Sequence, residues 1–266
     1  MVMSIMNKTQ NVEQQFSNDK NLDFRIEFYK KYTTNKYKFA DWLFDKYKFK
    51  ENISILEIGC GNGKHWEGRI EKLPKGTKLI LSDFLDGMLD LVKEKYSSYK
   101  NVSFEKIDIQ SIPFEDESFD IIIANHMLFH VPNLDNGLSE VQRVLKKGGY
   151  FYSATDGNGG MRPFLHEAIK QFDKENDAFT EKLPFNLQNG KEILSKYFSS
   201  VERYDYENTL AITKTEDLIE WLKSTKSISG FSEENLTNLY KYFENIRIQN
   251  GAINIPRETG VFISVK

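Results

Sequence analysis

Short apolar runs alternate with segments of helical periodicity through the first two thirds of the chain. The runs are too short for helices and end in glycine or polar residues, so they predict buried strands at 53–58, 78–82, 102–107, 119–124 and 150–154. Segments of helical periodicity at 65–72, 86–96 and 134–145 separate several of them. Strands that alternate with helices favour a parallel sheet with right-handed crossovers.

The pattern differs on both sides of this region. Residues 1–20 are polar and predict a frayed tail, whereas aromatic and apolar residues recur at helical spacing in 22–49 and predict two helices, with 33–35 capping the second. Beyond Asp156 the periodicity weakens. It predicts helices at 161–177, 190–197, 215–224 and 233–248, and strands at 201–212 and 260–265.

Composition restricts the class of protein. The 266 residues are 39% hydrophobic and 28% charged, as in a globular domain with a sizeable core. The net charge of −3 gives no basic field for nucleic acid. No signal-peptide or membrane-spanning run occurs, so we expect a cytoplasmic protein without membrane insertion. One cysteine and four scattered histidines give no disulfide and no metal-site pattern.

Glycine occupies every second position after the first predicted strand, at Gly59, Gly61 and Gly63. Such a loop turns tightly and lets a ligand approach the main chain. A dinucleotide fingerprint requires its third glycine at position 64, where the chain has lysine. The acid before the loop, Glu57, suits a cationic ligand better than a pyrophosphate. The loop alone is equally compatible with a turn that binds nothing.

Two further acids follow the next predicted strands. Asp83 stands where a carboxylate accepts hydrogen bonds from ribose hydroxyls, although a plain acid at a helix N-terminus is the alternative. Asp108 ends the following strand and is placed to accept from an adenine amino group. Because ligands bind along the carboxyl edge of open α/β sheets, the joint occurrence predicts a nucleotide-like site there.

With these motifs, residues 35–155 resemble the class I S-adenosylmethionine-dependent methyltransferases, closest to the small-molecule (type 11) branch of menaquinone and ubiquinone biosynthesis. The resemblance rests on the stretches 56–63, 83–89, 108–120, 128–131 and 143–149 in the expected order. It implies a Rossmann-like, doubly wound, mostly parallel seven-stranded sheet with an antiparallel C-terminal strand. It also implies an N-terminal tail and helical lid over 1–49, a methyltransferase domain over 50–266, and a helical insertion over 214–256.

The resemblance implies S-adenosylmethionine as cofactor and S-adenosylhomocysteine as product. Glu57 would contact the methionyl amino group, the backbone from Gly59 to Gly63, Cys60 included, would pack against methionine and ribose, and Asp83 would bind the ribose hydroxyls. Leu85 stands where the family often has serine. We expect the helix that follows the loop to lower the pKa of the Cys60 thiol modestly.

The remaining implied cofactor contacts flank the adenine or approach the sulfonium end. They are Phe84, Met88, Asp108, Ile109, Asn125 and His126, with Tyr32 on the lid beside Tyr29 and Tyr37. Core packing is the alternative for the three tyrosines.

Methyl transfer from a sulfonium disperses charge, so positioning and exclusion of water can supply much of the rate. A general base is needed only if the acceptor loses a proton, and His126 and His130 are the candidates, against a packed and hydrogen-bonded alternative. His65 is expected at a helix start, and His166 on a surface helix.

We expect a small-molecule methyl acceptor and a monomer or homodimer. An NAD-dependent oxidoreductase is disfavoured by Lys64, and adenine-N6 methylation by His126-Met127-Leu128 after Asn125, where two prolines and an aromatic would be needed. A methyltransferase acting on RNA or protein and a non-catalytic cofactor-binding protein remain alternatives. The insertion borders the acceptor pocket or forms a dimer contact.

Overall fold

The computed structural model describes residues 19–225 and 231–266. Residues 1–18 of the tail predicted at 1–20 lie outside the described residues, whereas Asp19 already begins a helix.

A single seven-stranded sheet forms the centre of the molecule, with the strand order β3-β2-β1-β4-β5-β7-β6. Its first five strands in the chain pair in parallel, and β7 runs antiparallel to both β5 and β6. The predicted mostly parallel sheet with an antiparallel C-terminal strand is confirmed. The strands are β1 (Ser54–Ile58), β2 (Lys78–Asp83), β3 (Val102–Lys106), β4 (Phe119–Ile123), β5 (Leu145–Asp156), β6 (Ser200–Ile212) and β7 (Ile253–Val265).

The central strands are apolar on both faces because helices or turns cover both. Leu56 belongs to one core cluster, with residues of α5 (Leu134–Val144) and α7 (Gly190–Leu194). Its neighbour Ile55 belongs to another, with residues of α3 (Phe39–Phe44) and α4 (Asp86–Tyr96). Successive strand residues face opposite sides of a sheet, so burial on both faces explains the continuous apolar runs that predicted these strands.

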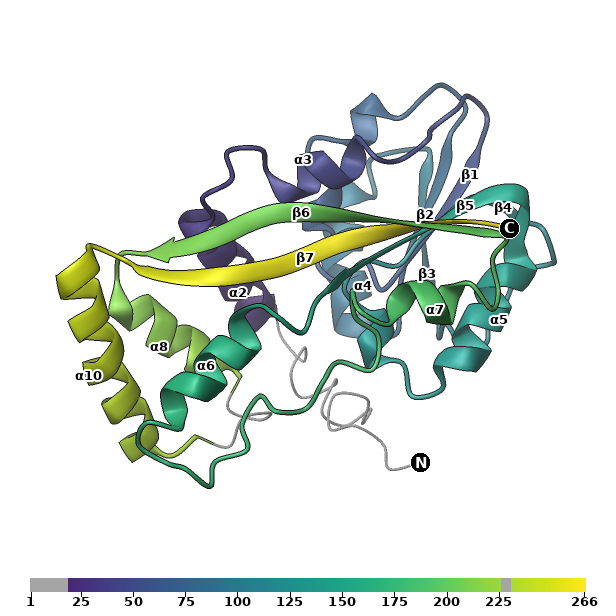
Figure 1. Ribbon diagram of the computed structural model, residues 1–266. Helices are drawn as coiled ribbons and strands as arrows, with labels where there is room; N and C mark the ends of the chain where they lie inside the picture. Colours follow the sequence, from purple (N-terminus) through teal and green to yellow (C-terminus); the bar gives the residue numbers. More distant parts are fainter. Residues whose placement is uncertain (1–18, 226–230) are drawn as a thin grey trace.

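Strands β6 and β7 form a long antiparallel pair that extends past the parallel strands (Figure 1). The extended end of this pair packs on a third core cluster, to which Leu210 and Ile255 belong. Four helices contribute most of the rest of that cluster: α2 (Asp19–Tyr32), α6 (Met161–Ile169), α8 (Thr215–Ser224) and α10 (Glu233–Asn250). The β6–β7 pair therefore carries a helical layer beside the parallel part of the sheet.

Several predicted boundaries are wrong. Residues 65–72 form two 3-10 segments, η2 (Lys64–Trp66) and η3 (Ile70–Lys72), because Gly63 and Gly68 adopt φ of 72° and 66° and interrupt a helix. Residues 33–35 do not cap α3 but pair with β6, where Thr33 bridges Leu210. Strand β7 begins at Ile253 instead of 260, since it pairs with β6 along its whole length. Helix α6 ends at Ile169, well before 177.

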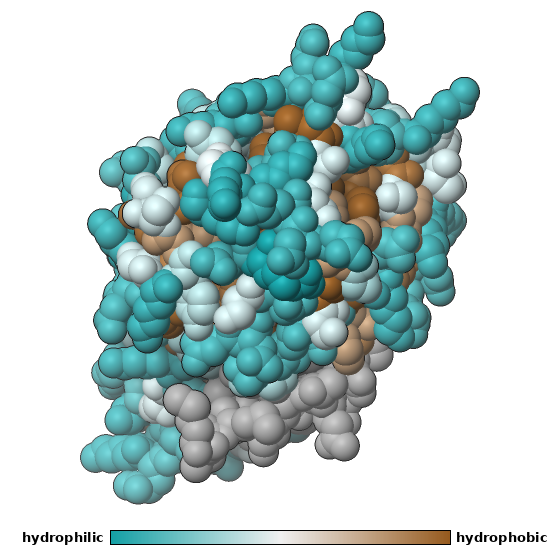
Figure 2. Space-filling view, turned by 90° about the vertical axis from the view of Figure 1, so that its right-hand side faces the viewer, coloured by the Kyte–Doolittle hydropathy of each residue, from teal (hydrophilic) through white to brown (hydrophobic). Residues whose placement is uncertain are grey.

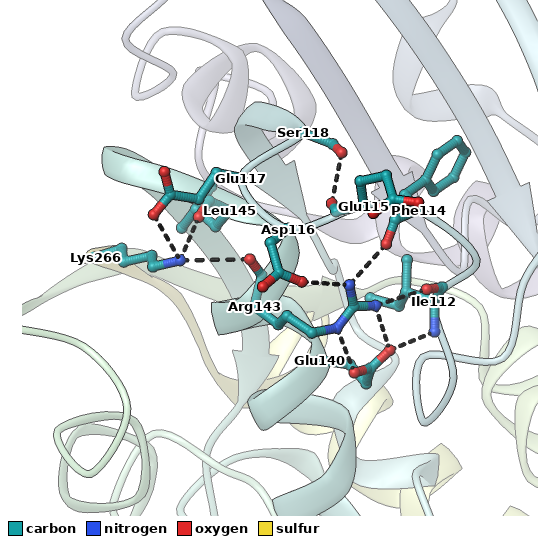
Figure 3. A network of polar contacts seen from close by, with 10 residues as sticks. All are labelled: Ile112, Phe114, Glu115, Asp116, Glu117, Ser118, Glu140, Arg143, Leu145 and Lys266. Atoms are coloured by element: carbon teal, nitrogen blue, oxygen red, sulfur yellow. Dashed lines mark hydrogen bonds and ion pairs between the residues drawn. The ribbon is translucent and has the colours of Figure 1, made fainter.

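Arg143 at the end of α5 fixes the loop that precedes β4 (Figure 3). Its guanidinium donates to the carbonyl oxygens of Ile112 (2.8 Å) and Phe114 (2.7 Å) and pairs with Glu140 and Asp116. These hydrogen bonds satisfy backbone groups of a loop that forms no ladder of its own. The network has a structural role, and none of these residues borders the cavity described below.

On the side of the molecule shown in Figure 2, hydrophobic side chains lie in small patches among hydrophilic ones. Scattered apolar side chains are ordinary on a protein surface. Within the described ranges, no helix combines the length and apolar character that crossing a membrane requires.

Candidate cofactor and acceptor site

A cavity of about 1170 Å³ lies at the carboxyl ends of the parallel strands. Each of the strands β1 to β5 contributes residues at or just beyond its end, among them Glu57, Asp83, Asp108, Asn125 and Asp156. Residues of α2, α3, α6, α8 and β7 complete the wall. Cavities that hold one small ligand are typically about 300–1,000 Å³, so this one has room for two.

The glycine loop requires glycine for two separate reasons. Gly59, Gly61 and Gly63 adopt φ of 71°, 56° and 72°, a region that disfavours residues with a Cβ. A Cβ at Gly63 would also lie 2.7 Å from side-chain carbons of Val92 and Tyr96. Every second residue of the loop is glycine because its backbone is left-handed there, and Gly63 in addition packs closely on α4.

Glu57 is a buried carboxyl group at the end of β1, only 2% exposed. The indole Nε1 of Trp66 donates to its Oε2 at 2.5 Å. The pKa of Glu57 is raised to about 7, chiefly by burial; the hydrogen bond from Trp66 opposes the rise, and Asp83 adds to it. A cation beside Glu57 would stabilise its charged form, so this carboxyl group fits a ligand ammonium group.

Asp83, at the end of β2, is likewise a buried acid. One carboxylate oxygen accepts from the Gly61 amide at 2.9 Å and the other from the Leu85 amide at 3.0 Å. These bonds join the glycine loop to the turn after β2. Burial raises the pKa of Asp83, and the backbone hydrogen bonds oppose the rise. Because the backbone amide of Leu85 donates to Asp83, leucine in place of serine leaves this anchor intact.

The residues expected around an adenine also border the cavity. Phe84 is 41% exposed at its rim, whereas Met88 and Ile109 are buried. Asp108 accepts from the backbone amide of Gln110 at 2.9 Å and from its side-chain amide at 3.1 Å. An apolar slot with one carboxylate on its edge can stack a flat base and accept from an amino group.

Asn125 belongs to a polar chain that the sequence did not indicate. Its Nδ2 donates to the Tyr47 hydroxyl at 3.0 Å, and that hydroxyl lies 3.0 Å from His65 Nε2. Burial lowers the pKa of His65 to about 3, so the ring is neutral. His65 lies in the short 3-10 helix η2, at the predicted helix start. Asn125 Oδ1 is buried without a hydrogen-bond partner in the described part of the chain, and it borders the cavity.

His126 adopts φ of 54°, a strained conformation for a residue other than glycine. Its amide donates to the Ala154 carbonyl at 2.8 Å, and its Nδ1 lies 3.8 Å from Asp156 Oδ2. Burial lowers the pKa of His126, Asp156 opposes this, and Arg257 lowers it further. A half-buried neutral imidazole can accept a proton. His130 also borders the cavity, with its ring beside that of Phe129.

Two expectations need correction. Burial and the nearby carboxylates raise the pKa of the Cys60 thiol well above its usual value, whereas we expected a modest lowering. Tyr32 does not border the cavity; its hydroxyl donates to Asp217 and its ring packs against Phe28. Tyr29, one helical turn earlier, borders the cavity instead.

Helix α2 lies directly against the glycine loop. Asn62 Nδ2 donates to Asp23 Oδ1 at 2.5 Å, and Lys64 Nζ lies 3.0 Å from the same carboxylate. The first described helix therefore forms part of the cavity wall. Across 19–225 and 231–266, no cluster of three or more histidine, cysteine or acidic residues has the arrangement of a metal site.

Comparisons with known proteins agree with this geometry. The family model described as a methyltransferase domain matches residues 56–153. A sterol 4-C-methyltransferase of Caenorhabditis elegans is 36% identical over 110 residues, which are 40% of this chain and 32% of the relative. A demethylmenaquinone methyltransferase of Staphylococcus aureus is 36% identical over 101 residues, 38% of this chain and 42% of the relative. The chain thus spans less than half the length of these curated relatives.

Solved structures share the fold over most of the chain. The YcgJ protein from Bacillus subtilis has a TM-score of 0.60 at 18% identity, covering 85% of this chain and 97% of that one. A Haemonchus contortus N-methyltransferase, in complex with phosphomonomethylethanolamine and S-adenosylhomocysteine, has a TM-score of 0.52 at 20% identity, covering 98% of this chain and 59% of that one. Residues 56–153 therefore match the methyltransferase-domain family, and the chain shares the fold of these solved structures.

Proposed function

We propose that this protein transfers a methyl group from S-adenosylmethionine to a small-molecule acceptor. The observation that carries the proposal is the pair of buried carboxyl groups, Glu57 and Asp83, on either side of the glycine loop. Buried acids without cationic partners are costly, and each lies where a polar or cationic group of the cofactor would bind it.

The residues of the cavity fit the parts of this cofactor. Glu57 binds the methionyl ammonium group, Asp83 the ribose hydroxyls, and Asp108 the adenine amino group, while Phe84 and Met88 enclose the adenine ring. Asn125 Oδ1 supplies an acceptor near the methionyl end. The bound cofactor supplies an electrophilic methyl group on a sulfonium. The main task of the protein is to hold an acceptor in line with that group and to exclude water.

His126 is the proposed base for acceptors that lose a proton. Its pKa is lowered, so the ring is neutral near pH 7, and Asp156 lies on its Nδ1 side at 3.8 Å. A neutral imidazole with a carboxylate beside one nitrogen can accept a proton on the other. His130 is a second candidate on the same wall.

A small acceptor is favoured by the size and the closure of the cavity. Its volume of about 1170 Å³ exceeds the usual volume for one small ligand, and α2, α3 and α8 contribute to its wall. On this proposal α2 and α3 act as the lid that we expected from residues 1–49, and α8 adds part of the helical insertion to the wall. The matched curated relatives named for sterol and demethylmenaquinone substrates support the same class of acceptor.

Asp83→Ala tests the cofactor assignment. Calorimetric titration with S-adenosylhomocysteine should show an affinity at least roughly tenfold lower, because the ribose hydroxyls lose a charged acceptor. Asp90→Ala is the matched control, since Asp90 lies on the exposed side of α4 and should leave the affinity unchanged. Equal affinities for Asp83→Ala and the unmodified chain would contradict the assignment.

The acceptor class is tested separately. Small amines, phenols and carboxylates, and in parallel RNA and protein fractions, are incubated with the full chain and S-adenosylmethionine, and methylated products are identified by mass. We expect product from a small acceptor. Product from RNA or protein alone would reverse the proposed class of acceptor.

A further inference from the structure

Three arginines, Arg25, Arg162 and Arg257, come from α2, α6 and β7 to one part of the cavity wall. They form the arginine cluster, and Tyr29 lies among them. The guanidinium of Arg257 lies 4.2 Å from the centre of the Tyr29 ring. The pKa of Tyr29 is raised to about 12, first by burial, while Arg257 and Arg25 act against the rise. Nothing in the proposed binding of the cofactor uses this cluster.

Two of these arginines lack a carboxylate partner within the described residues. Arg162 donates to the backbone oxygen of Glu181 at 3.0 Å and forms no ion pair there, and Arg257 packs on aromatic rings without a polar contact. Burial lowers the pKa of Arg162. A partly buried guanidinium without an anion is costly, and its planar fork of donors matches a carboxylate or a phosphate.

The acids near the arginine cluster form no ion pair with Arg162 or Arg257 among the described residues. Glu181 and then Asp156 raise the pKa of Arg162 from longer range, and Asp156 Oδ2 lies 3.8 Å from His126 Nδ1. Glu258 accepts instead from the Gly159 amide and the Gln188 side chain, both at 2.6 Å. The guanidinium groups of Arg162 and Arg257 therefore remain without a carboxylate in direct contact there.

Two further features of the same wall favour an anion. Arg162 lies in the first turn of α6, which contains no acidic residue and has no side-chain cap. A cation is unfavourable there and an anion is favourable, because of the helix dipole. Trp221 is 6% exposed and borders the cavity, and its Nε1 has no acceptor in hydrogen-bonding geometry among the described residues. The indole N–H can only donate, and the Tyr29 hydroxyl near it lies outside hydrogen-bonding geometry, so an acceptor oxygen on a ligand would satisfy it.

We propose that the methyl acceptor is a small anionic molecule whose carboxylate or phosphate group binds Arg162, Arg257 and the indole N–H of Trp221. Its apolar body lies against Phe39 and Phe179, which border the same part of the cavity. His126, with Asp156 beside it and its ring centre 5.5 Å from that of Phe39, would then face the reactive end of the acceptor. This proposal rests on the proposed methyl transfer and names the acceptor that the site selects.

The test compares ligands that differ only in charge. The full chain is saturated with S-adenosylhomocysteine, and the affinities of benzoate, phenyl phosphate, benzamide and benzylamine are measured by calorimetry. We expect at least one anionic probe to bind roughly tenfold or more tightly than benzamide, because hydrogen bonds to a charged group differ from neutral ones by about that factor. Benzoate and phenyl phosphate together show whether the site prefers a carboxylate or a phosphate.

Arg162→Gln and Arg257→Gln should each abolish most of this preference, whereas Arg257→Lys should keep part of it, because lysine retains the charge but not the fork. Arg247→Gln is the matched control, since Arg247 pairs with Glu244 on α10 outside the cavity. Unchanged affinity for S-adenosylhomocysteine shows that each variant is folded.

Equal binding of benzoate, phenyl phosphate and benzamide would overturn the proposal, as would an anion preference that survives in both glutamine variants. Binding of no anionic probe at all would overturn it as well. If S-adenosylhomocysteine itself fails to bind the unmodified chain, the proposed function fails. If it binds normally and no anion preference is found, only the proposed acceptor class fails.

Discussion

Replacing Glu57 by glutamine should make the protein more stable at alkaline pH and a poorer binder of its cofactor. The carboxyl group is 2% exposed and lies against the indole N–H of Trp66. Glutamine has almost the same shape, and its side-chain oxygen can keep this hydrogen bond. It differs in carrying no charge at any pH, so the variant isolates the cost of burying the charge.

The magnitude follows from the pKa of this group. Burial raises the pKa of Glu57 from 4.5 to about 7 in the folded chain. The folded chain therefore holds the proton more tightly than the unfolded chain. The stability that this group contributes is fully present below pH 4.5, falls as the pH rises, and is lost above pH 7. A tenfold difference in proton affinity is worth about 1.4 kcal/mol, so the total change is about 3 kcal/mol.

Urea unfolding of the unmodified chain and of Glu57→Gln, at intervals from pH 4.5 to pH 8, measures this change. We expect similar free energies of unfolding near pH 4.5, and near pH 8 a variant more stable by up to about 3 kcal/mol. Glu94→Gln on the exposed side of α4 is the control and should follow the profile of the unmodified chain. Parallel profiles for Glu57→Gln and the unmodified chain would refute the reasoning, because Glu57 would then titrate at its ordinary pKa.

Three other predictions concern the glycine loop, the Arg143 network and the buried thiol of Cys60. Gly63→Ala should destabilise the chain by roughly 2–4 kcal/mol in urea unfolding, because the residue has a φ of 72° and the added Cβ would lie 2.7 Å from side-chain carbons of α4. Gly87→Ala is the control; a Cβ there meets open space, so this variant should be neutral or slightly stabilising. Arg143→Gln removes hydrogen bonds to two loop carbonyls, so it should cost roughly 2 kcal/mol of stability and lower the thermal midpoint of unfolding. An unchanged midpoint would show that the network is not stabilising. The Cys60 thiol, buried and with a raised pKa, should react with a thiol-modifying reagent far more slowly at pH 8 than in urea, and equal rates would contradict its burial.

The sequence predicted the parts of the fold that local patterns determine. Strand β1 is apolar throughout because both of its faces are buried, and this pattern located it to within one residue. The acids Glu57, Asp83 and Asp108 follow successive parallel strands, whose carboxyl ends share one edge, and all three border the same cavity.

What the sequence did not predict depends on contacts between distant segments. Residues 65–72 have helical periodicity, but the left-handed Gly63 and Gly68 break the segment into turns. Tyr29 and Tyr32 share one stripe of α2, and only the packing of α8, where Asp217 accepts from Tyr32, turns one to the cavity and keeps the other in the core. No local pattern around them distinguishes the two.

The two ends of the cavity each contain a charged residue that lowers the stability of the folded chain. Glu57 is an acid whose charge is disfavoured by burial, and Arg162 is a cation at a helix start whose pKa burial lowers. Neither would be chosen for folding alone, since an uncharged residue of similar size would be at least as stable at each position. Opposite charges that are each unfavourable in the folded chain select for ligand groups of the complementary charge. On these proposals the acidic end would bind the ammonium and hydroxyl groups of the cofactor and the arginine end an anionic acceptor, so that one cavity would orient two different molecules toward each other.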